Sequence, residues 1–129
     1  MNLLGILHEF CINMGMTPWI QFTKENVQTV PDGLLGVFQL AREADQIAYV
    51  GRADKADLRE CIGAMLDKGY AYFQYANLPW TKETYEMHCR LYHHAGGRSR
   101  LDNLDHPYPP EGKHLQCPMS AVPPAMCEI

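Results

Sequence analysis

The stretch that decides the fold is Leu35–Gly51, which reads LGVFQLAREADQIAYVG. Two apolar runs, Leu35–Leu40 and Ile47–Gly51, flank the polar segment Arg42–Gln46. Short apolar runs joined by a few polar residues are typical of a β-hairpin. The turn signal Pro31–Gly33 (PDG) precedes the first run and marks where the hairpin region begins. The sequence therefore predicts two strands joined by a polar loop.

The segments on either side of this hairpin show the periodicity of short helices and strands. Apolar residues from Leu58 to Leu66 recur at helical spacing, and Gly69 then provides a natural end. The aromatic run after Gly69 has the composition of a strand. We expect, in chain order, a helix over 3–14, a strand over 19–22, the hairpin, a helix over 54–68, a strand over 70–75 and a helix over 81–94 with Thr81 as its N-cap.

This order of elements predicts an α/β domain of the α+β kind. Its sheet would be small, three-stranded and mixed or antiparallel, with helices flanking it. Six of the nine prolines lie between Pro107 and Pro124, a composition that excludes a helix or a central strand there. We therefore divide the chain into an N-terminal extension over 1–33, a domain over 34–105 and a proline-rich extended arm over 106–129.

The bulk composition is that of an ordinary globular protein, with 47% hydrophobic residues. No run approaches the roughly 20 apolar residues of a membrane span. The first ten residues lack a basic start, which argues against a secretory signal and favours the cytoplasm. The net charge of -4 argues against a protein whose main task is to bind nucleic acid.

The five cysteines are odd in number and irregularly spaced, and none forms a C-x-x-C pair. Such spacing gives little support for a structural zinc site. We expect reduced thiols, several of them buried, and no bound cofactor.

Gly36–Phe38, followed by Tyr49–Gly51, resembles the paired strand motifs of the GIY-YIG nucleases. The helix expected over Glu83–His94 resembles the one that presents a catalytic glutamate in that family. The segment Leu101–Asn103 resembles its late asparagine-bearing loop. The resemblance spans roughly residues 34–108 and implies the family's fold. It also implies metal-assisted phosphodiester hydrolysis, in which a tyrosine, an arginine and a glutamate act with Mg²⁺ or Mn²⁺.

At most positions of the implied active-site groove, this chain has a different side chain from the one that the family uses. Phe38 replaces the first tyrosine, Cys61 stands at the arginine position and His88 at the glutamate position. Met65 occupies a site where the family often has histidine or tyrosine. The expected groove positions are Phe38, Tyr49, Cys61, Met65, His88 and Asn103.

Several alternatives remain for these residues. If the domain cleaves nucleic acid, Tyr49, Arg59 and Asn103 are the candidate catalytic residues. Cys61 and His88 are a less favoured pair of metal ligands, or a nucleophile with its base. The basic residues that could contact phosphates are Arg52, Arg59, Arg98 and Arg100, although nearby acidic residues offset their field.

The sequence thus favours a non-catalytic GIY-YIG-like protein that serves as a protein-interaction or assembly subunit. The N-terminal helix, the proline-rich arm, or both would contact the partner protein. The alternatives are a divalent-metal-dependent endonuclease and a nucleic-acid-binding module that does not cleave.

Overall fold

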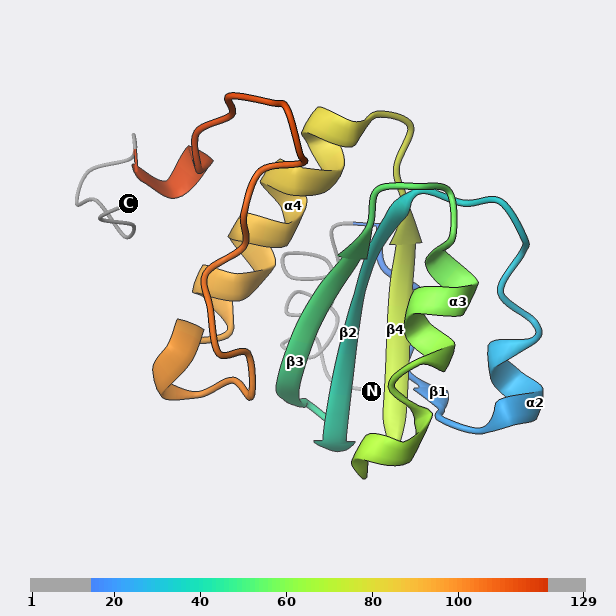
Figure 1. Ribbon diagram of the computed structural model, residues 1–129. Coiled ribbons are helices and arrows are strands. Elements are labelled where there is room, and N and C mark those ends of the chain that lie inside the picture. The colour runs from blue at the N-terminus through green and yellow to red at the C-terminus, as the bar shows by residue number, and fades with distance from the viewer. Residues whose placement is uncertain (1–14, 121–129) are drawn as a thin grey trace.

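The computed structural model describes residues 15–120 and has a four-stranded sheet at its centre (Figure 1). The strands are β1 (Ile20–Gln21), β2 (Gly36–Glu43), β3 (Gln46–Ala53) and β4 (Tyr72–Asn77). Their order across the sheet is β1-β4-β2-β3, and every neighbouring pair is antiparallel. The α/β class is as predicted, and the sheet contains no parallel pair among these strands.

The three-stranded sheet expected from the sequence is wrong, because the short strand before the hairpin joins the sheet as its fourth member. Ile20 pairs with Phe73 on β4. Thr17 extends this edge, since its amide donates to the Tyr75 carbonyl at 2.8 Å and its hydroxyl accepts from the Tyr75 amide at 3.1 Å. Residues assigned to an N-terminal extension therefore complete the sheet. The helix expected over 3–14 lies outside the described residues.

The hairpin predicted from Leu35–Gly51 is confirmed as β2 and β3, with Phe38 opposite Gly51. The strands run closer to the turn than expected, and Asp45 takes a positive φ of 67° at the tip. Asp tolerates this left-handed conformation better than most residues.

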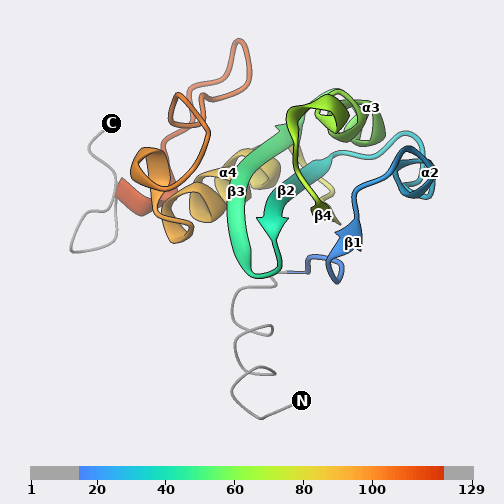
Figure 2. The same cartoon turned by 90° about the horizontal axis from the view of Figure 1, so that it is seen from below.

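One face of the sheet is covered by α3 (Leu58–Gly63) together with α2 (Lys24–Val27), as Figure 2 shows from below. Leu58 and Ile62 project from α3 into an apolar cluster that contains Phe38, Leu40 and Phe73. The helix is shorter than the expected 54–68, because it begins after a turn in which Ala56 takes a φ of 57°. Its continuation is a 3₁₀ turn at Leu66–Lys68.

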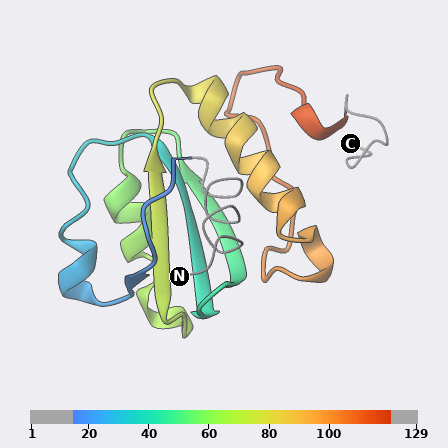
Figure 3. The same cartoon turned by 180° about the vertical axis from the view of Figure 1, so that it is seen from behind.

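The opposite face packs against α4 (Thr81–His94), which lies toward the β3 side of the sheet (Figure 3). Leu91 and Tyr92 from this helix join Val37 and Val50 in a second apolar cluster. The helix has the predicted length, but its N-cap is Trp80 rather than Thr81. The Trp80 carbonyl accepts hydrogen bonds from both the amide and the hydroxyl of Thr84.

After a 3₁₀ turn at Gly97–Ser99, the chain passes β3 and runs back along α4 (Figure 1). The described part of the arm ends in another 3₁₀ turn at Pro118–Ser120. Cys117 and Met119 from the arm pack against Tyr85 and Cys89 of α4, with Leu115 at the margin. The end of the described part of the arm therefore rests on α4.

Two glycines permit close approaches within the sheet. A Cβ atom at Gly51 would lie 2.4 Å from the Phe38 ring, so the ring can lie across β3 only because that position is glycine. A Cβ atom at Gly36 would lie 2.0 Å from the carbonyl oxygen of Ala76 on β4. Because this carbonyl oxygen belongs to the backbone, it cannot move away by rotating about a side-chain bond.

We therefore predict that Gly36→Ala lowers the free energy of unfolding by about 2–3 kcal/mol, since the new methyl forces β2 and β4 apart. Gly63→Ala is the matched control, because its Cβ would meet Val27 at an ordinary 3.7 Å. That helical substitution should cost nothing and can add up to about 1 kcal/mol. Urea unfolding of both variants measures the difference, and equal stabilities would contradict the packing described.

Candidate functional site

Four of the six expected groove positions lie on the sheet face that α3 covers. Phe38 and Tyr49 come from the paired strands, and their ring centroids are 6.1 Å apart. Cys61 and Met65, from α3 and the turn after it, pack on the same apolar cluster. These four residues thus form part of a hydrophobic core.

Tyr49 and Cys61 are poorly suited to proton chemistry in this setting. Burial, followed by the nearby Cys61 thiol, raises the pKa of Tyr49 above its ordinary value. Burial, with the neighbouring carboxylate of Asp57, raises the pKa of Cys61 to about 11. Both groups are therefore protonated at neutral pH, whereas activating a water or attacking an electrophile requires the ionised form.

Arg59, the candidate for stabilising phosphate charge, is engaged with acidic neighbours. Its guanidinium lies 3.4 Å from the carboxylate of Asp32 and 4.0 Å from that of Glu60. The side chain is 27% exposed and points to these surface acids. A phosphate would have to compete with both.

Asn103 acts as an edge partner for β3. Its Oδ1 accepts from the Val50 amide at 3.0 Å, and its Nδ2 donates to the Val50 carbonyl at 2.8 Å. The next bond along the edge runs from the Asp102 amide to the Ala48 carbonyl, at 2.7 Å. The Asn103 amide thus satisfies the edge of β3 as a neighbouring strand would.

Arg52 joins β3, α4 and the arm through one side chain, which is only 11% exposed. Its Nε lies 3.0 Å from both carboxylate oxygens of Asp54, and Nη1 lies 3.0 Å from Nδ1 of His88. Nη2 donates to the carbonyl of Tyr108 in the arm, and the guanidinium sits 5.3 Å from the ring centroid of Tyr85. These contacts use the planar fork that distinguishes arginine from lysine.

His88, at the position of the implied metal-binding glutamate, is a buried neutral imidazole. Burial, and then the positive charge of Arg52, lowers the pKa of His88 to about 3. Because Arg52 donates to Nδ1, the ring proton resides on Nε2. Among the described residues, no acceptor meets hydrogen-bond geometry with Nε2, although an interaction with the backbone of Val50 opposes the fall in the pKa. A hard metal ion such as Mg²⁺ prefers oxygen ligands, which this ring does not offer.

The expected groove positions are therefore divided between the two faces of the sheet. Successive strand residues point to opposite faces, so Tyr49 lies on the α3 side while Val50 and Arg52 lie on the α4 side. Cys61 belongs to the first face and His88 to the second, so the structure does not bring this pair together. The basic set is divided too, because Arg98 and Arg100 are exposed and Arg52 is not.

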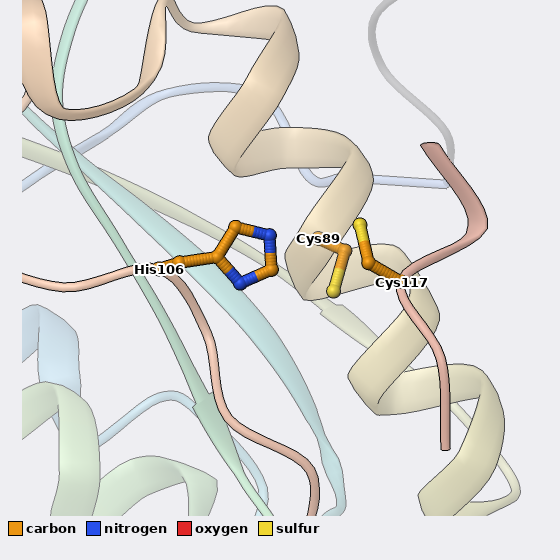
Figure 4. A group of neighbouring side chains, drawn as sticks. All are labelled: Cys89, His106 and Cys117. Carbon is orange, nitrogen blue, oxygen red and sulfur yellow. The ribbon is translucent and has the colours of Figure 1, made fainter. Parts of the chain in front are cut away.

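A different group of side chains converges where the arm meets α4. Ligand atoms of Cys89, His106 and Cys117 all lie within 4.8 Å of one another, and both cysteines are buried. Figure 4 shows the His106 ring directed toward the two cysteine side chains. Burial, with the nearby Cys117 thiol, raises the pKa of Cys89 to about 12, and a hydrogen bond with Tyr85 opposes this shift. Among the described residues, Cys61, Cys89 and Cys117 are not in disulfide bonds.

Sequence reasoning missed this group, because its members come from a helix and an irregular arm and share no short spacing. One local signal was present in the sequence. Cys89 and His93 are four residues apart on a predicted helix and therefore lie on one face. His106 and Cys117 lie in the proline-rich arm, where no paired spacing indicates a metal site.

No helix within residues 15–120 combines the length and apolar character that crossing a bilayer requires. We compared the chain with models of known protein families, with curated proteins and with solved structures, and none of them matches it.

We predict that Arg52→Lys lowers the free energy of unfolding by about 2 kcal/mol, because lysine cannot keep the contacts to Asp54, His88 and the arm together. The exposed Arg98→Lys is the control and should change stability by less than about 0.5 kcal/mol. Chemical denaturation measures both. Unchanged stability with weaker DNA binding would instead identify Arg52 as a phosphate contact.

Proposed function

We propose that this chain is a non-catalytic GIY-YIG-like domain that serves in the cytoplasm as a protein-interaction or assembly subunit. The observation that carries the proposal is the division of the expected groove positions between two faces of one sheet. Phosphodiester hydrolysis needs a water activator, a cation and a metal ligand around one phosphate. Here Tyr49 and His88 lie on opposite sides of β3.

The state of the individual side chains supports the same proposal. Tyr49 packs against the α3-side core and has a raised pKa, Arg59 pairs with acids, and both amide atoms of Asn103 are bonded to the backbone of Val50. Each of the three candidate catalytic residues thus has a structural role that accounts for its presence.

The assembly role is supported by exposed aromatic and apolar side chains near α4 and the arm. Trp80, Leu104 and Tyr108 are 65%, 80% and 66% exposed. Large aromatic residues are the usual anchors of protein interfaces, where they fill apolar pockets of the partner. We propose that the partner is a protein that presents such pockets to Trp80 and Tyr108.

The catalytic part of the proposal is tested with the full-length chain. In Mg²⁺ or Mn²⁺, we expect no cleavage of single-stranded or branched DNA above the level of metal and buffer alone. Metal-dependent cleavage that disappears in Tyr49→Phe and persists in the exposed control Tyr108→Phe would refute the proposal. Cleavage that is equal in both variants would point to a contaminating nuclease.

The interaction part is tested by purification of the full-length chain from its own cell. We expect a stoichiometric protein partner that is reduced at least tenfold in the Trp80→Ala, Tyr108→Ala double variant. Lys24→Ala on α2, at an exposed position on the other face of the sheet, should retain it. If the unaltered chain, the double variant and Lys24→Ala all recover the same amount of partner, Trp80 and Tyr108 do not form the binding surface. If the chain instead associates with itself and the double variant does not, the partner is a second copy of this chain.

A further inference from the structure

The group formed by Cys89, His106 and Cys117 has the composition of a metal site. A tetrahedral zinc ion has bonds of about 2.3 Å to sulfur and 2.0–2.1 Å to nitrogen, which places ligand atoms roughly 3.3–3.8 Å apart. The ligand atoms of these three residues lie within 4.8 Å of one another. The His106 ring faces both cysteines, and side-chain rotations are needed to turn the two sulfur atoms toward one ion (Figure 4).

A fourth side chain, that of His93, contacts His106 but lies outside the set of ligand atoms that are within 4.8 Å of one another. His93 lies one helical turn after Cys89, and its Nε2 is 3.0 Å from Nε2 of His106. The two ring centroids are 5.0 Å apart. Two imidazoles that meet through their Nε2 atoms either share a proton or direct two lone pairs at a common cation. The 3.0 Å separation is close to the edge of a zinc tetrahedron.

The other nitrogen of His106 favours the cation. Nδ1 lies 2.7 Å from the carbonyl oxygen of Pro107, so this nitrogen carries the proton and donates it. The lone pair is then on Nε2, the atom that faces His93. A histidine that ligates metal through one nitrogen usually donates its other N–H to a carbonyl or carboxylate, which fixes the tautomer.

We propose that Cys89, His106 and Cys117 bind one zinc ion, and that His93 becomes the fourth ligand when its ring turns toward them. Two thiolates and two imidazoles are the ligands that zinc accepts in a tetrahedral structural site. The two thiolates balance the charge of the ion, so the site can form in the buried space between α4 and the arm. With four protein ligands the site has no open position for a substrate, and the ion is structural.

The zinc ion fastens the arm to α4. The backbone hydrogen bonds within the described part of the arm are local, from Lys113 to Pro110 and from Ser120 to Cys117. Segments without regular structure need side-chain or metal anchors to keep one conformation. Two ligands come from the helix and two from the arm, so the ion joins segments that the backbone does not.

The site is tested on the full-length chain purified in a thiol reductant. Elemental analysis should give one zinc per chain. Replacement by Co²⁺ should produce the visible absorption of tetrahedral cobalt with a thiolate-to-cobalt charge-transfer band. Cys117→Ser and His93→Gln should each lower metal affinity at least tenfold. Two matched controls should leave the metal affinity unchanged. Cys61→Ser alters a half-buried thiol on α3, and His94→Gln alters the exposed histidine next to His93.

A second measurement uses the unaltered chain, so its result does not depend on whether the variants fold. Alkylation followed by mass spectrometry should show that Cys89 and Cys117 react at least tenfold faster after chelation, while metal has less effect on Cys61. A reduced chain that holds no metal and gives no charge-transfer band with Co²⁺ would overturn the proposal. Metal retained in the Cys89→Ser, Cys117→Ser double variant, or a Cys89–Cys117 disulfide in place of the metal, would overturn it as well.

Discussion

The burial of β2 on both of its faces is the constraint on which the rest of the structure depends. Every residue from Gly36 to Ala41 is buried, because β3 and β4 pair with its two edges and helices pack on its two faces. The one polar side chain in this run, Gln39, is satisfied by a 2.6 Å hydrogen bond with Gln74 on β4. A strand of this kind forces the flanking segments to opposite sides, so α3 and α4 are separated by the sheet.

This separation determines where chemistry can occur in the chain. The α3 side is an aromatic and aliphatic core, and the pKa values of Tyr49 and Cys61 at its margin are raised. On the α4 side, Arg52 contacts Asp54, His88 and the arm. The group of Cys89, His106 and Cys117 lies where the same helix meets the arm. The polar and metal-binding capacity of the domain is thus concentrated where the arm meets α4, beyond the expected groove.

The sequence predicted the local features well and the long-range ones poorly. The hairpin and α4 follow from local apolar periodicity and turn residues, which act over a few positions. A strand at Ile20 was predicted, but its place in the sheet was not, because Ile20 pairs with Phe73 and nothing near Ile20 specifies a partner that far along the chain. The Cys89–His106–Cys117 group was missed for the same reason, since its geometry exists only after the arm has folded onto α4.

X-ray absorption spectroscopy at the zinc edge of the purified full-length chain tests the junction of α4 and the arm most directly. We predict two sulfur ligands at about 2.3 Å and two nitrogen ligands at about 2.0–2.1 Å, with the multiple scattering of imidazole rings. A first shell of oxygen and nitrogen alone, or a chain that holds no zinc, would contradict the metal-fastened arm.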